Sequence, residues 1–267
     1  YEPNNYDNRF HGPVTVRVAI ANSFNVPAVK ALDYAGIYDD PATEEKEGMI
    51  ALAERLGFTT LTRPDYGLSL ALGGGDVSVL EMTGAYAVMA NGGVRIPPVA
   101  ITKILDHNGE LVYEYTPPEG EQVLRPEHAF LISSILSDNA ARSWMFGPNS
   151  YLHLPFPAAA KTGTSNDFRD NWTMGYTPDL VTGVWVGNAN GEGRPELTGV
   201  DSAAPILFDV FNLLPRKSWF QPPLNDLEYA EVCSLSGHLA QDDCPKTKQL
   251  ITRSGKKTSV CPYHKLV

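Results

Sequence analysis

The chain has 267 residues, of which 43% are hydrophobic, and this is enough apolar side chain to bury a substantial core. The formal net charge of −10 excludes a nucleic-acid-binding domain, because contacts to phosphates need Lys and Arg gathered on one surface and the sequence has no such patch. No apolar run reaches the roughly 18 residues of a membrane span, and no stretch reads as a signal peptide.

The first half of the chain is predicted to be mostly helical. Two short helices flank an elbow at Ser23-Phe24-Asn25, with Asn25 as the cap of the second helix. Such an elbow can present polar side chains to a cleft. The Asn108-Gly109 pair predicts a β-hairpin formed by 101–105 and 111–115. Helices are predicted over 14–21, 26–34, 44–56 (with an acidic first turn), 77–89 and 125–136.

The second half changes character to strands. Segments 158–164, 172–176 and 180–187 are separated by short polar turns, which predicts an antiparallel meander, and 205–214 is predicted to be a helix laid on that sheet. The predicted fold class is therefore α+β, an antiparallel sheet flanked by helices plus a helical lobe, with a cleft between them. From 222 onward the sequence reads as a linker and the start of a Cys-containing module.

The segment Lys161-Thr162-Gly163-Thr164 lies within the first predicted strand and carries coherent chemistry. Lys161 offers a cation for a substrate carboxylate, the two threonines offer hydroxyls, and Gly163 would let a peptide backbone approach as an added strand. Alternation sends Lys161 and Thr162 to opposite faces, so we expect an edge strand that borders a cleft. Taken alone, the segment is also compatible with an ordinary strand that has a surface lysine.

Ser23-Phe24-Asn25 matches Ser-x-Asn, which together with Lys-Thr-Gly makes two of the three motifs of penicillin-inhibited serine acyl transferases. With residues 21–29 and 169–172, these motifs resemble the class A bifunctional penicillin-binding proteins. The likeness runs from the first residue to about 214, and the Cys-bearing end is most similar to the penicillin-binding protein 1C subfamily. The resemblance implies a β-lactamase/transpeptidase-like fold, incomplete at its N-terminus, with residues 1–221 as the C-terminal part of the transpeptidase domain.

The resemblance implies a D,D-transpeptidase that crosslinks peptidoglycan stem peptides through an acyl-serine intermediate, with β-lactams as inhibitors. Ser23 would relay protons beside Lys161, and the backbone N–H of Thr164 would be one oxyanion donor. It implies no metal or organic cofactor, and it places the protein in the periplasm or on the extracytoplasmic face of the inner membrane. The residues that would bind substrate are Asn25, Thr162, Gly163 and Thr164.

Two other matches compete with this assignment. Ser137-Asp138-Asn139 is a second Ser-x-Asn, but it lies shortly before Lys161, whereas the family places a helical lobe between these motifs. Ser254-Gly255-Lys256-Lys257 is the sole Ser-x-x-Lys, but the family's nucleophile precedes Ser-x-Asn. The nucleophile is therefore expected upstream of Tyr1, with a glycosyltransferase module and a membrane anchor. We expect this segment to be inactive alone, and either paired with that upstream portion or poorly stable.

The same motifs would also occur in proteins that do not crosslink cell wall. One alternative is a sensor module that binds penicillin or wall peptide without turnover. Another is a D,D-carboxypeptidase or β-lactamase-type hydrolase, which would deacylate bound penicillin rapidly. The fate of the acyl-enzyme separates these functions.

Three cysteines, Cys233, Cys244 and Cys261, occur close to the end of the chain and nowhere else. The pattern favours an oxidising compartment and a local disulfide between Cys233 and Cys244 that leaves Cys261 unpaired. The alternative is a zinc site formed by all three with His264, suggested by the short Cys261-to-His264 spacing. The sequence leaves this choice open.

Overall fold

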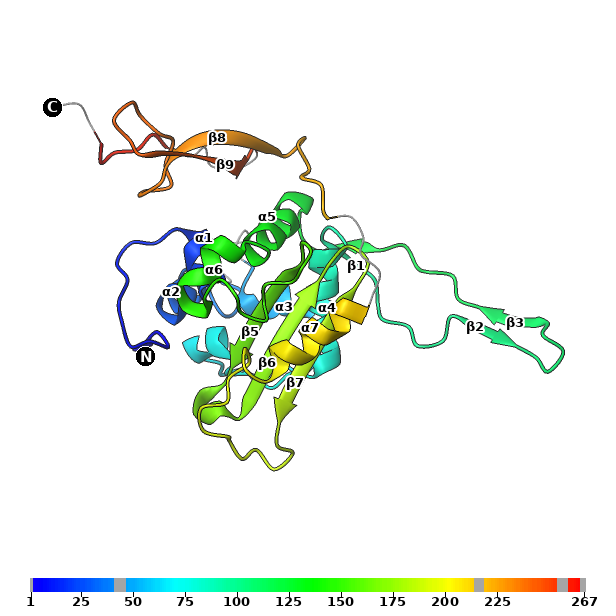
Figure 1. Ribbon diagram of the computed structural model, residues 1–267. Helices are drawn as coiled ribbons and strands as arrows, with labels where there is room; N and C mark the ends of the chain where they lie inside the picture. Colours follow the sequence, from blue (N-terminus) through cyan, green and yellow to red (C-terminus); the bar gives the residue numbers. More distant parts are fainter. Residues whose placement is uncertain (1, 41–46, 214–218, 254–258, 265–267) are drawn as a thin grey trace.

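The computed structural model describes residues 2–40, 47–213, 219–253 and 259–264 (Figure 1). The described helices are α1 (Val16–Ala21), α2 (Asn25–Ala35), α3 (Met49–Leu56), α4 (Val79–Ala90), α5 (Pro126–Leu136), α6 (Asn139–Phe146) and α7 (Ala203–Leu213). The strands are β1 (Val94–Arg95), β2 (Lys103–Leu105), β3 (Leu111–Glu114), β4 (Glu121–Gln122), β5 (Ala159–Thr164), β6 (Asp170–Tyr176), β7 (Val181–Gly187), β8 (Leu227–Cys233) and β9 (Lys246–Thr252). No helix in the described ranges is long and apolar enough to cross a bilayer.

The central sheet is an antiparallel meander in the order β5-β6-β7, which confirms the prediction for this region. Helix α7 packs on one face, and α4 packs on the other together with α5 (Figure 1). Glycines allow both approaches: a Cβ at Gly175 would lie 2.8 Å from Leu207 of α7, and one at Gly183 would lie 2.2 Å from Thr83 of α4. The sheet is therefore buried on both faces, with β5 at an edge.

The core between the sheet and the helices is built from small and aromatic side chains. Ala159 of β5 and Tyr176 of β6 are fully buried against Ala90 and Leu136. The Tyr176 hydroxyl lies 3.0 Å from the Ser133 hydroxyl of α5, which pairs this buried polar group. These contacts hold β5 firmly against the helical layer that carries the elbow.

The elbow between α1 and α2 forms where it was predicted, but Asn25 does not cap α2. Phe24 occupies the cap position without a side-chain bond, and Asn25 is the first helical residue. The N–H of Val26 is instead satisfied by Asn5, whose Oδ1 accepts at 3.1 Å. A residue distant in sequence thus replaces the local cap, which a local pattern cannot reveal.

Helix α3 begins at Met49, later than the predicted start at 44, and it has no acidic first turn. Residues 47 and 48 are not helical. Met49 N–H donates to Gly36 O at 3.0 Å and Gly48 N–H donates to Asp39 Oδ1 at 2.8 Å, and both bonds lead to the chain before the helix. Glu47 precedes the helix and pairs with Arg55 in its last turn. The predicted positions 44–46 lie outside the described residues.

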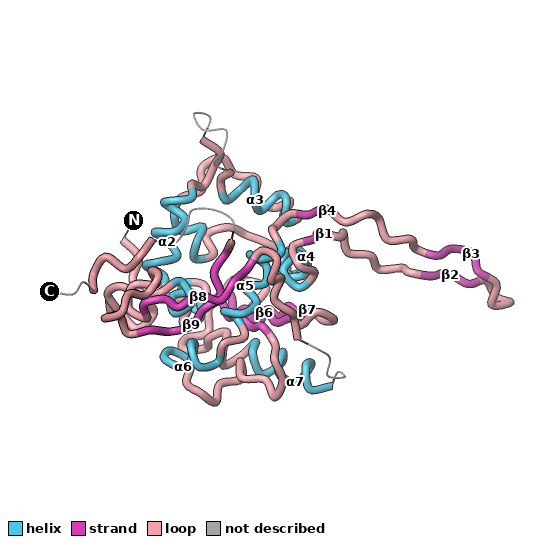
Figure 2. Tube along the Cα trace, turned by 90° about the horizontal axis from the view of Figure 1, so that it is seen from above, coloured by secondary structure: helices cyan, strands magenta, loops and turns pink. Residues whose placement is uncertain are grey.

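Two hairpins leave the body of the domain. The predicted hairpin at Asn108-Gly109 is confirmed as β2 and β3, which form a projecting arm with exposed side chains (Figure 2). Beyond the sheet, β8 and β9 pair over seven residues each in a segment for which no strand was predicted. The domain boundary after 221 stays a prediction.

Candidate functional site

The side chain of Lys161 leaves β5 toward the α1–α2 elbow and meets Ser23 there. Its Nζ donates to Ser23 Oγ at 2.7 Å and to the carbonyl of Thr162 at 2.6 Å. Both Ser23 and Lys161 are partly buried. The structure therefore brings together the two residues that the sequence assigned to proton transfer.

Ser23 adopts a backbone conformation that side chains other than glycine seldom take. Its φ is 57°, in the left-handed region, and it sits between the end of α1 and the start of α2. A non-glycine residue held in this conformation costs on the order of 1 kcal/mol and persists only where its surroundings impose it. In this conformation the Ser23 hydroxyl lies within hydrogen-bond distance of Lys161.

The neighbouring Asn22 holds the elbow in place. It is 2% exposed, and its Nδ2 donates to Val18 O at 2.9 Å and to Ala141 O at 2.8 Å. Its Oδ1 accepts from Met145 N–H at 3.0 Å. The bonds to Ala141 and Met145 tie the elbow that carries Ser23 to α6, a helix that was not predicted from the sequence.

Burial and a neighbouring buried arginine on α6 both lower the pKa of Lys161. Arg142 is 3% exposed and donates to Ala160 O at 3.2 Å and to Leu136 O. Burial of Lys161 and the positive charge of Arg142 lower the pKa of Lys161 to about 8. Burial also lowers the pKa of Arg142 to about 10, against the opposing effect of Asp138.

Sequence analysis did not identify Arg142 as part of the site, and the sequence pattern around it gives only a weak indication of its position. The residues before it, Ser137 and Asp138, are typical of a helix start, and Asp138 does accept from Ala141 N–H at 2.9 Å as the cap of α6. This cap could have predicted a short helix just before the strand region. The sequence could not have shown that Arg142 of this helix lies close to Lys161 of β5.

The two threonines of the motif lie on the other face of β5. Thr162 pairs with Thr173, and Thr164 Oγ1 accepts from Gly199 N–H at 3.0 Å on the α7 side of the sheet. The expected separation of Lys161 and Thr162 onto opposite faces is therefore confirmed. The structure does not bring the Thr162 hydroxyl to the Ser23–Lys161 pair.

The free edge of β5 presents backbone groups beside that pair. Ser165 N–H donates inward to Asp170 O at 2.9 Å, so alternation along the antiparallel ladder directs the N–H groups of Thr162 and Thr164 outward. The Thr162 carbonyl also points outward, where Lys161 binds it. Among the described residues no strand pairs with this edge.

Gly163 is not required by the packing of the fold. A Cβ at this position would have only the Trp172 Cβ as a neighbour, at an ordinary contact distance of 3.5 Å. At Gly199, by contrast, a Cβ would lie 2.5 Å from Trp172 O and 2.6 Å from Gly163 O. The missing side chain at Gly163 thus keeps space open rather than relieving an internal clash.

The side chains of the remaining candidates bond to backbone carbonyls. Asn25 donates from Nδ2 to Asn4 O at 2.8 Å, close to Ser23 in the chain. In the competing Ser-x-Asn, Ser137 donates to Ser134 O at 3.3 Å, and Asn139 donates to Pro148 O at 2.9 Å. These bonds serve helix ends. Ser254, in the Ser-x-x-Lys match, lies outside the described residues.

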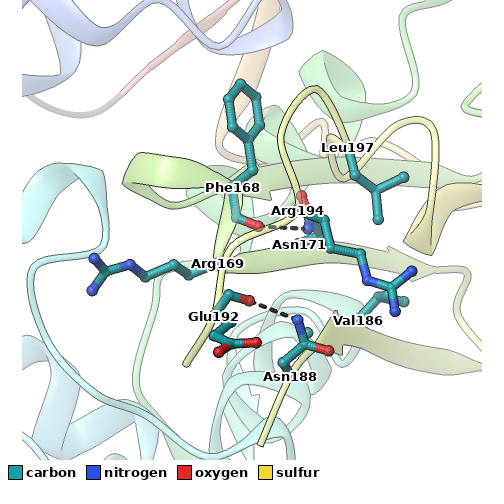
Figure 3. A pocket seen from close by; sticks show the side chains of 9 residues that line it. Phe168, Arg169, Asn171, Val186, Asn188, Glu192, Arg194 and Leu197 are labelled. Carbon is teal, nitrogen blue, oxygen red and sulfur yellow. Dashed lines mark hydrogen bonds between the residues drawn. The ribbon is translucent and has the colours of Figure 1, made fainter. Parts of the chain in front are cut away.

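A cavity of about 230 Å³ is lined by residues of β6, β7 and the loops at the end of the sheet (Figure 3). Bonds across its wall join Asn171 Nδ2 to Phe168 O at 3.4 Å and Asn188 Nδ2 to Glu192 O at 2.7 Å. Its lining contains neither Ser23 nor Lys161. We assign it no role.

The predicted disulfide between Cys233 and Cys244 is wrong for this structure. All three cysteines carry free thiols, and they are buried together. Their sulfur atoms lie around His264 instead of pairing with each other. Cys233 and Cys244 are therefore not bridged, and Cys261 is not separate from them.

Residues 1–212 match the family model described as the penicillin binding protein transpeptidase domain. Penicillin-binding protein 1A of Aquifex aeolicus (strain VF5) is 37% identical over 233 residues, which cover 84% of this chain and 29% of that protein. Penicillin-binding protein 4 of Bacillus subtilis (strain 168) is 35% identical over 189 residues, which cover 70% of this chain and 28% of that protein. The chain thus spans less than a third of the length of these relatives.

Solved structures agree with this match. The crystal structure of penicillin-binding protein 1A from Haemophilus influenzae has a TM-score of 0.77 and 26% identity, covering 98% of this chain and 43% of that one. The PonA1 protein from Mycobacterium tuberculosis in complex with penicillin V has a TM-score of 0.65 at 20% identity, covering 88% and 64%. The predicted fold is therefore confirmed, while the similarity to the 1C subfamily stays a prediction.

Proposed function

The chain belongs to the penicillin-binding protein transpeptidase family, and on that premise we propose that it forms part of the active site of a peptidoglycan D,D-transpeptidase. The observation that carries the proposal is the 2.7 Å bond from Lys161 Nζ to Ser23 Oγ, made by two motif residues from different elements. Family membership supports the reaction class, an acyl transfer through a serine ester. The substrate would be the D-Ala-D-Ala end of a stem peptide.

Ser23 is proposed to move a proton between the nucleophile and the leaving amine. Lys161 donates to the Ser23 oxygen, so the hydroxyl proton of Ser23 remains available for donation to another group. Protonation of the leaving amine by a positioned group typically contributes about 10²–10⁴-fold to such a reaction. The lowered pKa of Lys161 makes its own proton easier to share than that of an exposed lysine.

The substrate peptide is proposed to lie along the free edge of β5. The outward N–H of Thr164 would donate to the oxyanion, and the open space at Gly163 would admit the peptide backbone. The ammonium of Lys161 would attract the terminal carboxylate. The Thr164 hydroxyl lies on the α7 side of β5, where it accepts from Gly199 N–H, so its role in binding that carboxylate is proposed from the motif alone. The roles of Thr162 and Asn25 in binding are proposed from the motif alone.

We further propose that residues outside this sequence supply the nucleophilic serine and cover apolar helix faces that this chain leaves exposed. Apolar side chains exposed on the helices, among them Val16 of α1 and Leu80 of α4, support such a covering. The setting would be the extracytoplasmic face of a membrane, where cell wall is made. A β-lactam would acylate the site as a mimic of D-Ala-D-Ala.

Acylation by a fluorescent penicillin, measured on the full-length protein that contains this chain, tests the proposal. We expect Ser23→Ala to slow acylation by about 10²–10⁴-fold. Ser137→Ala, in the competing motif, should leave the rate unchanged. Equal rates for Ser23→Ala and the unchanged protein would overturn the proposed role.

Product analysis with a stem-peptide donor and an amine acceptor separates the reaction types. Formation of the crosslinked product supports the transpeptidase. Release of D-Ala with hydrolysis alone would indicate a carboxypeptidase, and a stable acyl-protein without any product would indicate a sensor.

A further inference from the structure

The C-terminal module brings three cysteines and a histidine from separate stretches of chain to one point. Cys233 ends β8, and Cys244 lies just before β9. Cys261 and His264 come from the segment after the hairpin. The three cysteines are buried and His264 is partly buried.

Backbone pairing holds these stretches in place. Leu239, in the turn between the strands, bridges to Val232 on one side and to Val260 on the other. Cys261 N–H donates to Leu239 O at 2.9 Å, next to the second bridge. The convergence of the four side chains is thus produced by the hairpin and its added third stretch.

The sulfur-to-nitrogen distances in this cluster match those of a tetrahedral zinc site. The Nδ1 atom of His264 lies 3.5 Å from Cys233 Sγ, 3.5 Å from Cys244 Sγ and 3.3 Å from Cys261 Sγ. All four ligand atoms lie within 4.8 Å of one another. Zinc bound to sulfur at about 2.3 Å and to nitrogen at about 2.0 Å in a tetrahedron requires S-to-N distances of about 3.5 Å.

We propose that Cys233, Cys244, Cys261 and His264 bind one Zn²⁺ ion. Three sulfurs at nearly equal distances from one imidazole nitrogen are explained by a common central ion, whereas a disulfide would pair two of them and leave the third thiol and the imidazole without a role. Thiolate and imidazole ligands in a tetrahedron select zinc over Mg²⁺ or Ca²⁺, which prefer oxygen ligands.

Polar groups around the sulfurs fit bound thiolates. Ser236 Oγ donates to Cys261 Sγ at 3.2 Å, and Gln241 N–H donates to Cys244 Sγ at 3.3 Å. Three thiolates exceed the charge of one Zn²⁺ by one negative charge. Donors aimed at the sulfurs offset that excess and orient the ligands.

The site is structural, because four protein ligands complete the tetrahedron and leave no position for a substrate. The three thiols form a buried cluster with Ala240 as a partly buried apolar neighbour, and Leu227 and Val232 are the other buried side chains in the described part of this module. A segment of this size cannot bury enough apolar surface to be stable through a hydrophobic core alone. Metal binding would supply that missing stability.

Cobalt substitution tests the site directly. The 267-residue chain, purified without a His-tag and in the presence of a thiol-free reductant, is stripped of metal and titrated with Co²⁺. We expect saturation at one equivalent, with the intense visible bands of tetrahedral cobalt and a near-ultraviolet sulfur-to-cobalt charge-transfer band. One equivalent of Zn²⁺ should then abolish them, and elemental analysis of protein from zinc-supplemented cells should find one zinc per chain.

Cys261→Ser and His264→Ala should lower the zinc content from one per chain toward zero. His238→Ala is the matched control, because His238 lies in the same module and bonds Ser259 Oγ at 2.8 Å without belonging to the cluster. The proposal is overturned if the reduced chain gives no tetrahedral cobalt bands, or if His264→Ala and His238→Ala retain equal zinc. Failure here leaves the proposed transpeptidase site untouched, since no residue is shared.

Discussion

Lys161 Nζ lies 2.7 Å from Ser23 Oγ although 138 positions separate the two residues in the chain. The bond joins an edge strand to the elbow between two helices. Burial and the positive charge of Arg142 of α6 lower the pKa of Lys161, while Asn22 anchors the elbow to the same helix. The strand, the elbow and α6 therefore act as one unit in positioning the Ser23 hydroxyl.

The pH dependence of β-lactam acylation should show an alkaline limb near pH 8. The pKa of Lys161 is about 8, and the proposed mechanism uses its ammonium form, so the rate should fall as that proton is lost. Arg142→Gln removes the neighbouring charge and should move this limb to higher pH. Arg142→Lys keeps the charge and should leave it nearer its original position. A rate that rises through pH 8 would contradict the proposed use of the ammonium.

Replacing Lys161 with methionine should stabilise the chain while removing function. The pKa of Lys161 is lowered from 10.5 to about 8 in the folded state, so folding carries a penalty on the charged form that is complete below pH 8 and disappears above 10.5. We expect Lys161→Met to raise the free energy of unfolding by about 1–3 kcal/mol at pH 7, with a smaller gain at pH 10. Urea unfolding at both pH values measures this, and a loss of stability at pH 7 would refute it.

Asn22→Ala should reduce both stability and acylation. It removes the part-buried side-chain bonds to Ala141 O and Met145 N–H, at a cost of about 1–3 kcal/mol, and it frees the elbow that holds Ser23. Asn139→Ala, which removes one exposed bond to Pro148, is the control and should cost about 0.5 kcal/mol. If both variants unfold at the same denaturant concentration, Asn22 is not the anchor.

Gly163→Ala should weaken β-lactam acylation without destabilising the fold. The added methyl group meets only an ordinary contact to Trp172, but it occupies the space proposed for the substrate backbone. Gly199→Ala, by contrast, should lower the free energy of unfolding by about 1–3 kcal/mol, because its methyl group would press on two carbonyl oxygens. Normal acylation kinetics for Gly163→Ala would argue against a substrate strand along β5.

The sequence alone determined the elements that depend on local pattern. The strand meander, the hairpin at Asn108-Gly109 and the helix from Pro126 follow from alternation, turn residues and helix-start residues within a few positions of each other. The order of the two motifs likewise identified Ser23 and Lys161 as candidates before any distance was known. Short-range rules suffice to predict such features, because alternation, turn residues and helix-start residues are read within a few positions of the chain.

Only the tertiary structure decided the features that depend on distant contacts. Asn5 replaces Asn25 in satisfying the N–H of Val26, burial and Arg142 lower the pKa of Lys161, and three thiols gather around His264 instead of forming the predicted disulfide. The physical reason is common to all three. Burial and close approach between segments far apart in the chain set the energies of polar and ionisable groups, and sequence spacing does not encode which segments meet.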